Sequence, residues 1–245
     1  MHLLIDVGNT RIKWQLITDE YDCEKKSDSG SLHDLSEFIQ TLNTREIDTL
    51  VAAVNQTAEL KNLLDQSSFR SIAVASSQSS QVGVYNSYVH PERMGVDRWL
   101  AMIAAFTQNK AKDQDKGIIV VDAGSALTID VVSVNGKHQG GYIVPGLIMA
   151  QQALFANTER VIQYDEVSVN KAGLDKYKKL GNNTIQCVEY GVINQMIALV
   201  KQVNEEYLDY EIFFTGGDGE LLAGYLGTGT VDKDLVLKGL WQVRN

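Results

Sequence analysis

The sequence predicts an α/β protein made of two similar halves, each a mixed β-sheet with flanking helices. Two observations support this fold class. An apolar strand that ends in an aspartate and a glycine turn occurs at residues 4–10 and returns, in the same layout, at residues 120–126. In each half, strand patterns are followed by alternating helix and strand patterns. A polar stretch at 108–116 separates the two, so we expect one half in residues 1–114 and the other in residues 115–245.

The composition is that of an ordinary globular protein and argues against several classes of function. Of the 245 residues, 44% are hydrophobic and 22% are charged. A net charge of −9 without any basic block argues against nucleic-acid binding. No leader precedes the first strand and no apolar run approaches about 18 residues, so neither a signal peptide nor a membrane-spanning helix is expected. The widely separated Cys23 and Cys187 suit reduced thiols, which predicts a cytoplasmic protein.

The first half begins with a predicted hairpin. Residues 3–5 form an apolar run, residues 8–10 a tight turn, and the following residues alternate. Ile12, Trp14 and Leu16 would face one side of the sheet, and Arg11, Lys13 and Gln15 the other. The later elements are an edge strand at 21–27, helices at 32–42 and 57–66, and strands at 49–54 and 70–75. The predicted order is therefore three antiparallel strands, then helix, strand, helix, strand.

The segment that follows combines an irregular stretch with a helix start. Residues 85–93 are expected to be irregular, and a helix is expected to begin after Gly95. Apolar residues at positions 96, 99, 100 and 103 define its buried face. Asp97 and Arg98 lie in the first turn of this helix, away from that face.

The second half repeats this plan. Asn135–Gly136 predicts a type I′ hairpin turn, and the strand at 142–144 ends at Pro145–Gly146, where a helix should begin. Residues 158–183 are expected to be rich in loops. Thr184 is a candidate N-cap for a long helix with apolar residues at 185, 188, 192, 196, 199 and 203. A strand at 211–214 then leads into a Thr-Gly-Gly turn and a further helix.

Five short motifs occur in one order along the chain. They are Asp6, Gly8, Asn9, Thr10 and Lys13; Gly95, Val96, Asp97 and Arg98; Asp122, Gly124, Ser125 and Ala126; Gly140, Gly141, Pro145 and Gly146; and Thr215, Gly216 and Gly217. Two strand–carboxylate–glycine turns with a late Thr-Gly-Gly resemble the actin/Hsp70/sugar-kinase superfamily. The full set, in its order and spacing, resembles the type III pantothenate kinases. The resemblance runs from Leu3 past Gly217, with one departure: Ser125 stands where that family usually has threonine.

The resemblance implies a fold and a reaction. Two ribonuclease-H-like (actin-like ATPase) halves would close over ATP, and the γ-phosphoryl group would pass to the primary hydroxyl of pantothenate. The product, 4′-phosphopantothenate, enters coenzyme A biosynthesis. Because phosphoryl transfer has a loose transition state, the protein would chiefly position groups and neutralise charge.

The resemblance also assigns the acceptor side of the site. Asp97 would be the catalytic base; the alternative is an aspartate that only stabilises the first turn of its helix. Arg98 would hold the carboxylate of pantothenate; the alternative is a surface ion pair. Tyr88, Thr184 and the backbone at Gly95 and Val96 would also contact pantothenate, although N-capping explains Thr184 equally well.

The nucleotide side is assigned in the same way. The resemblance places ATP against residues from both glycine turns and the Thr-Gly-Gly turn: Asp6, Val7, Gly8, Asn9, Thr10, Arg11, Ile12, Lys13, Ser125, Gly216 and Gly217. Asp6 would hold Mg²⁺, through water, because magnesium keeps several waters and few protein ligands. For Lys13 the alternative is an exposed strand lysine. Asp122 would bind a monovalent cation, K⁺ or NH₄⁺, or else serve as a second carboxylate directed at Mg²⁺.

The resemblance further implies a homodimer with the pantothenate pocket at the subunit interface. The long helix from Thr184 could supply that contact, although its apolar stripe equally suits the core. Two rival functions remain: another kinase or ATPase of the superfamily, and a non-catalytic accessory protein, which would be expected to lack Asp97 or the Asp6 turn. Neither a G-x-G-x-x-G after the first strand nor a Walker A motif is present, which disfavours a Rossmann dehydrogenase and a P-loop enzyme.

Overall fold

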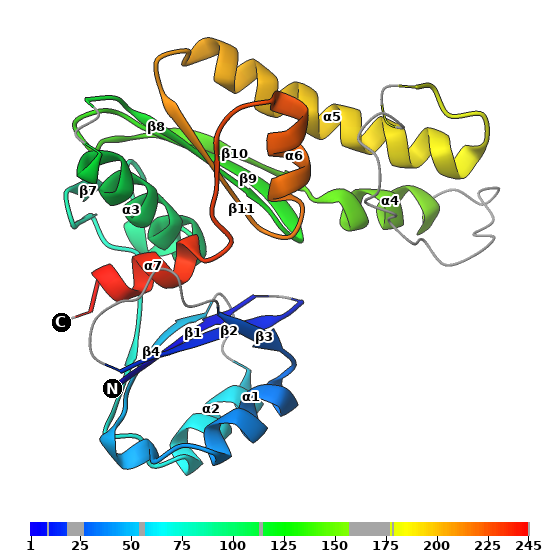
Figure 1. The fold of residues 1–245 in the computed structure, drawn as a ribbon. Helices are drawn as coiled ribbons and strands as arrows, with labels where there is room; N and C mark the ends of the chain where they lie inside the picture. Colours follow the sequence, from blue (N-terminus) through cyan, green and yellow to red (C-terminus); the bar gives the residue numbers. More distant parts are fainter. Residues whose placement is uncertain are drawn as a thin grey trace. The chain divides into compact units, whose positions relative to one another are not determined.

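The computed structural model describes residues 1–8, 10–18, 27–53, 57–112, 115–156, 177 and 179–244. Its contacts divide the chain into two compact units, which are described one at a time (Figure 1). Unit 1 comprises Met1–Gln114, Asn135–His138 and Asp234–Asn245, and unit 2 comprises Asp115–Val134 and Gln139–Lys233. A single cut between residues 114 and 115 would therefore assign two short segments of unit 1 to the second half of the sequence.

Unit 1 contains a five-stranded mixed sheet with the strand order β3-β2-β1-β4-β5. β1 is antiparallel to β2 and parallel to β4, while β3 extends the antiparallel side and β5 the parallel side. The strands are His2–Val7 (β1), Ile12–Ile17 (β2), Asp28–Gly30 (β3), Asp48–Ala53 (β4) and Ser71–Val74 (β5). The predicted order of elements is confirmed, but β3 begins at Asp28, and residues 21–26 of the expected edge strand lie outside the described residues.

The helices of unit 1 cover both faces of this sheet. They are Leu32–Gln40 (α1), Ala58–Gln66 (α2), Val96–Ala111 (α3) and Leu235–Gln242 (α7), with short 3₁₀ turns at Thr44–Glu46 and Pro91–Arg93 and a small hairpin of Ser80–Gln81 (β6) and Val84–Tyr85 (β7). α1 and α2 lie side by side on one face of the sheet (Figure 1). α7 contacts β1 and β4 and packs along α3.

Alternation along β1 decides what each face of the sheet carries. Leu3 and Ile5 belong to the core cluster with α1 and α2. His2 and Leu4 lie on the opposite face, where the ring of His2 meets that of Trp241 of α7 with centroids 5.3 Å apart. Asp6, two residues beyond Leu4, shares this second face. The predicted alternation of β2 is confirmed, since Ile12 and Trp14 join the α1–α2 cluster.

Unit 2 repeats the sheet of unit 1, with the strand order β10-β9-β8-β11-β12. The strands are Ile118–Ala123 (β8), Ala126–Val132 (β9), His138–Pro145 (β10), Glu211–Thr215 (β11) and Thr230–Val231 (β12). β8 is antiparallel to β9 and parallel to β11, as β1 is to β2 and β4. The predicted fold class, two similar mixed sheets with flanking helices, is confirmed.

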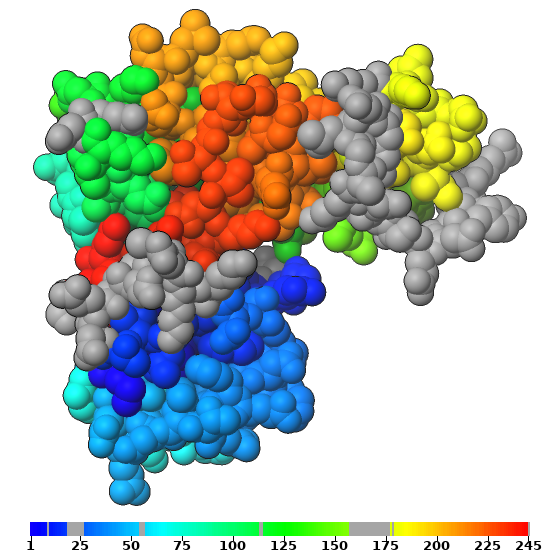
Figure 2. All heavy atoms as spheres, viewed as in Figure 1, coloured from blue at the N-terminus to red at the C-terminus, as the bar shows by residue number. Residues whose placement is uncertain are grey.

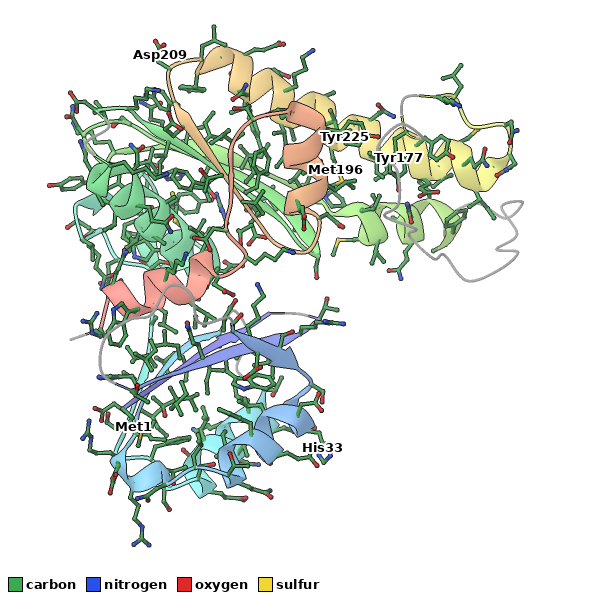
Figure 3. The ribbon with its side chains drawn as sticks, viewed as in Figure 1. Met1, His33, Tyr177, Met196, Asp209 and Tyr225 are labelled. Atoms are coloured by element: carbon green, nitrogen blue, oxygen red, sulfur yellow. The ribbon has the colours of Figure 1, made fainter. Side chains whose placement is uncertain are left out.

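Three helices complete unit 2: Leu147–Ala156 (α4), Thr184–Glu206 (α5) and Gly219–Leu226 (α6). Its core joins one face of the sheet to α5 and α6. Tyr177, Met196 and Tyr225 gather there, with the two tyrosine rings 6.1 Å apart (Figure 3). The opposite side of α5 is exposed and forms the orange and yellow surface in Figure 2. Most of the expected loop at 158–183 lies outside the described residues.

Side-chain caps explain where several helices begin. Ser31 and Asp34 form a reciprocal capping box at α1, and the Thr57 hydroxyl caps α2. At α5 the expected N-cap is wrong by one residue. The side chain of Asn183 accepts the backbone N–H of Gln186 at 3.0 Å, and Thr184 is the first helical residue.

The type I′ turn expected at Asn135–Gly136 is also wrong. Gly136 has φ +78°, but Asn135 does not adopt a positive φ, which a type I′ turn requires. Instead, the β6–β7 hairpin has a two-residue loop, Val82 (φ +49°) and Gly83 (φ +80°), with positive φ at both positions. The Gly136 turn docks on that loop, because its carbonyl accepts the N–H of Tyr85 at 2.8 Å. None of the helices in the described part of the chain is long and apolar enough to cross a membrane.

Candidate active site

The end of β1 in unit 1 brings a carboxylate and a lysine together. Asp6 pairs with Lys13 across the β1–β2 ladder, and directly opposed residues project to the same face with Cβ atoms about 5 Å apart. The N–H of Gly8 donates to the carbonyl of Arg11 at 3.1 Å and closes the turn. Lys13 is half-buried, so the alternative of an exposed strand lysine is wrong. Asn9 lies outside the described residues.

The N-terminus of α3 supplies a second carboxylate. Gly95 is the N-cap residue and provides no side-chain cap. Asp97, in the first turn, accepts the backbone N–H of Arg98 on Oδ1 at 2.8 Å. A Cβ atom on Gly95 would lie 2.6 Å from this Oδ1, so a glycine there leaves room for the carboxylate. Asp97 therefore satisfies one helix N–H with one oxygen, and within the described residues Oδ2 has no hydrogen bond.

Tyr88 and Arg98 meet beside this helix start. Nη1 of Arg98 donates to the Tyr88 hydroxyl at 3.0 Å, and the guanidinium carbon lies 5.8 Å from the ring centroid. Arg98 is only 6% exposed, so the alternative of a surface ion pair is wrong. A side chain of the Tyr88 loop also holds its backbone, since the N–H of Tyr88 donates to the side-chain Oδ1 of Asn86 at 2.9 Å. Val96 is 7% exposed, which leaves its backbone rather than its side chain for ligand contact.

In unit 2, two segments converge on the turn after Asp122. The N–H groups of Gly146 and Asp218 donate to the carbonyls of Ser125 (3.0 Å) and Ala123 (2.9 Å). A Cβ on Gly146 would lie 2.3 Å from the carbonyl oxygen of Gly124. Close backbone approach therefore requires glycine at this position.

Gly216 borders the Asp122 carboxylate directly. It has φ +80°, and a Cβ there would lie 2.4 Å from Oδ1 of Asp122. Thr128 and Thr215 are the register partners of Asp122 on the neighbouring strands, so their side chains project to the same face. The turn thus joins a carboxylate, two hydroxyls and closely packed backbone.

The metal ions that the sequence implies can be tested against the donor atoms present. In the described ranges no three His, Cys, Asp or Glu side chains gather into a metal cluster. Mg²⁺ does not need one, because it is commonly held by one or two carboxylates, water and substrate phosphate; Asp6 fits that role. Asp122 precedes a turn in which the carbonyls of Ala123 and Ser125 accept backbone N–H groups. Carboxylate and carbonyl oxygens are hard ligands, so the donor atoms at this turn fit a hard cation.

The structure decides between the alternative roles of some predicted residues and places one further residue, His138, beside the site. Asn183 rather than Thr184 caps α5, and Thr184 is exposed, so capping does not account for its hydroxyl. Ile12 is buried in the core, which leaves only its backbone for phosphate contact. His138, which was not expected at the site, lies with its ring centroid 6.2 Å from that of Tyr88. No sequence signal marks it, because 50 residues separate the two along the chain.

Comparisons with known proteins identify what this chain resembles. The sequence profile of the type III pantothenate kinases matches residues 2–206. A type III pantothenate kinase from Marinobacter nauticus is 33% identical, with 99% of this chain and 98% of that protein aligned. One from Pseudomonas aeruginosa is 34% identical, with 98% and 97% aligned.

Solved structures extend the likeness to the fold. A Campylobacter jejuni protein assigned to the Baf family of transcriptional activators superposes with a TM-score of 0.61 at 24% identity, covering 98% of this chain and 96% of that one. A Sinorhizobium meliloti protein assigned as a 2-dehydro-3-deoxygalactonokinase gives a TM-score of 0.55 at 10% identity, covering 98% and 97%. At these identities the structures are compared for fold alone.

Proposed function

Because this chain belongs to the type III pantothenate kinase family, we propose that it transfers the γ-phosphoryl group of ATP to the primary hydroxyl of pantothenate. This reaction is the first step of coenzyme A biosynthesis. The observation that carries the proposal is the contact of Tyr88 with the buried Arg98, next to Asp97. It joins an anion-binding fork and a carboxylate at one helix N-terminus, which suits an acceptor with a carboxylate and a hydroxyl.

The acceptor residues have distinct roles in this mechanism. The guanidinium of Arg98 binds the substrate carboxylate, for which its planar fork is suited. Oδ2 of Asp97 receives the hydroxyl proton as the substrate oxygen bonds to the γ-phosphorus and the bond to ADP breaks. A carboxylate is a weak base, but in a loose transition state the proton can leave late. Tyr88, Gly95, Val96 and Thr184 complete the acceptor contacts.

The nucleotide residues act by position and charge. Asn9, Thr10 and the ammonium of Lys13 contact the phosphates, and the rest of the first turn, Val7, Gly8, Arg11 and Ile12, lines the nucleotide. Ser125, Gly216 and Gly217 also contact the nucleotide. Asp6 would hold the Mg²⁺ that accompanies ATP, and Asp122 would hold K⁺ or NH₄⁺. These ions supply positive charge to the phosphates when bound.

We also propose that the protein is a homodimer with the pantothenate pocket at the subunit interface. Five large apolar side chains at the end of β10 and on α4 are between 46% and 60% exposed: Tyr142, Ile143, Ile148, Met149 and Leu154. We call them the β10–α4 surface. Apolar groups of this kind commonly mark protein contacts. A cytoplasmic location fits the exposed free thiol of Cys187.

A coupled assay of ADP release tests the proposed reaction. Pantothenate should stimulate ADP release, whereas glucose and acetate should not, and omission of K⁺ and NH₄⁺ should lower the rate. A sugar or acetate as the preferred acceptor would favour another kinase of the superfamily. No release with any of these acceptors would favour the non-catalytic alternative.

A further inference from the structure

His138 reaches from the start of β10 into the loop that carries Tyr88, within unit 1. It is 4% exposed, although it follows directly after the β9–β10 turn. Its Nδ1 lies 2.8 Å from the hydroxyl of Ser87, a hydrogen-bond distance, and its ring contacts that of Tyr88 at 6.2 Å between centroids. A buried imidazole with both a hydrogen bond and a ring contact is held in one orientation.

The backbone around His138 fixes it in register with the Tyr88 loop. Gly136 accepts the N–H of Tyr85 at 2.8 Å, and Lys137 forms an isolated parallel bridge with Tyr85. A Cβ on Gly136 would lie 1.9 Å from the carbonyl oxygen of Gly83, so the two backbones touch. His138, one residue past the bridge, therefore cannot shift relative to Ser87 without breaking these contacts.

Tyr88 lies between His138 and the guanidinium of Arg98, so the position of its ring affects both. Its ring contacts His138 on one hand and Arg98 on the other, and its hydroxyl accepts from Nη1 of Arg98 at 3.0 Å. Arg98 is a long side chain with several rotatable bonds, and a fork that binds a carboxylate on two oxygens tolerates little misalignment. The hydrogen bond to Tyr88 is thus one of the contacts that set the direction of the guanidinium.

We infer that His138 is a positioning residue for acceptor binding: it holds Tyr88, and through Tyr88 the guanidinium of Arg98, in the orientation that receives the substrate carboxylate. This inference rests on the proposed function. The positioning role requires both the ring contact with Tyr88 and the hydrogen bond with Ser87. Phenylalanine would keep only the ring contact, and asparagine would keep only a polar atom near the position of Nδ1. Neither replacement supplies both.

The test compares two acceptors, pantothenate and its analogue in which the carboxylate is replaced by a hydroxymethyl group. With pantothenate, His138→Ala should raise KM about tenfold, the size expected when one or two hydrogen-bonded contacts become misaligned, and should leave kcat within about threefold. His138→Phe and His138→Asn should each fall between wild type and His138→Ala. With the analogue, which has no carboxylate for Arg98, the KM of wild type and variants should agree within about twofold. The exposed His33→Ala is the matched control and should change neither KM (Figure 3).

Each other outcome contradicts a specific claim. Equal KM increases for both acceptors would assign His138 a purely structural role and overturn the inference while the kinase assignment stands. An unchanged KM for pantothenate in all three variants would do the same. If His138→Ala does not fold, the Phe and Asn variants decide by the same comparison. Wild-type protein that phosphorylates neither acceptor would overturn the proposed function, and this inference with it.

Discussion

The two carboxylate oxygens of Asp97 have different surroundings. Oδ1 accepts the N–H of Arg98 in the first turn of α3, as a helix-stabilising aspartate does. This contact uses one oxygen only, so the structural role and the proposed catalytic role of Asp97 are compatible. They also respond differently to an amide, whose side-chain oxygen can still accept the N–H but whose NH₂ group accepts no proton.

Asp97→Asn should therefore remain folded and lose kcat by at least about 10²-fold, the lower range for loss of a general base. The measurement is coupled ADP release at saturating pantothenate, with circular dichroism to check folding. Glu92→Gln removes an exposed carboxylate from the same segment and should keep near-normal turnover. Near-normal turnover of Asp97→Asn would exclude Asp97 as the base.

Val82 stores backbone strain in the hairpin that precedes Tyr88. Its φ of +49° lies in the left-handed region, which costs a β-branched residue about 1–2 kcal/mol. The contacts around it hold this geometry, because Gly83 touches Gly136 and the side chain of Gln81 accepts Nε1–H of Trp99 at 3.1 Å. Asparagine followed by glycine is a preferred pair for such a turn.

Val82→Asn should raise the free energy of unfolding by about 1 kcal/mol, because asparagine tolerates a positive φ. Urea denaturation followed by tryptophan fluorescence measures the change. Gly83→Ala is the reciprocal control: at φ +80° it should destabilise by about 1 kcal/mol. A stability loss in Val82→Asn would show that side-chain packing outweighs backbone strain at this position.

At the scale of single elements, the start of α5 distinguishes the helix-capping role from the substrate-contact role, which the sequence alone does not. Serine, threonine, asparagine and aspartate all cap helices, and Asn183 and Thr184 are adjacent, so residue type alone does not choose between them. The geometry assigns the cap to Asn183. Thr184 then remains a candidate for substrate contact.

Asn183→Ala should lower the free energy of unfolding by about 1 kcal/mol, the usual cost of a lost N-cap, with KM for pantothenate unchanged. Thr184→Ala should change stability by less than about 0.5 kcal/mol and raise KM for pantothenate several-fold. The pair of variants forms its own control, with urea denaturation and steady-state kinetics measured on both. The reverse pattern would return the capping role to Thr184.

At the edge of the first sheet, Arg70 and Ser71 bind the carboxylate of Asp48 in a pH-sensitive contact. The guanidinium of Arg70, helped by the hydroxyl of Ser71, holds the pKa of Asp48 well below its ordinary value of 3.8. These contacts join the first residue of β4 to the start of β5, since Asp48 and Ser71 are register partners. The carboxylate form is therefore favoured more in the folded than in the unfolded chain.

Because the pKa of Asp48 is lower in the folded than in the unfolded chain, its carboxylate stabilises the fold at pH values above the unfolded pKa. This stabilisation is lost as the pH falls through the folded pKa. Arg70→Met should thus have a lower urea midpoint than wild type at about pH 6, and the difference should shrink as pH falls below about 4. The exposed Arg45→Met is the control, with no pH-dependent difference. A gap that stays constant down to about pH 2 would contradict the role of Asp48.

At the scale of the whole molecule, the proposed dimer concerns the exposed apolar side chains of the β10–α4 surface. Ile148→Glu should shift the sedimenting species from dimer to monomer, because burying a charge at an apolar contact is costly, and should lower activity. Leu208→Glu places the same charge at a side chain that is 78% exposed between α5 and β11, and should leave both unchanged. An active monomer would contradict a pocket at the subunit interface.

Much of this architecture could be predicted, because its signals are local. Alternation in β2 indicated the buried side of Trp14, and the recurrence of the Asp6 turn at Asp122 indicated two equivalent sheets. Residues 95–98 indicated a helix start with Asp97 in its first turn. These features depend on neighbours within a few positions, so residue type and spacing are sufficient.

The remaining features depend on distant contacts. Asn135–Gly136 has the composition of a type I′ turn, but the turn docks on the backbone at Gly83 and takes another shape. That docking brings His138 and Tyr88 together, and no pattern near either residue in the sequence predicts their contact. The hydrogen bond between Tyr88 and Arg98 likewise depends on the path of the intervening loop.

The position of α7 in unit 1 limits how the chain can be shortened. Although it is the last helix, it belongs to unit 1 and covers the face of β1 that carries His2 and Leu4. A gene fragment that encodes residues 1–114 would expose the buried Leu4 on this face to water and should yield an aggregating product. Any autonomous version of the first unit would need residues 234–245 spliced back on through a linker.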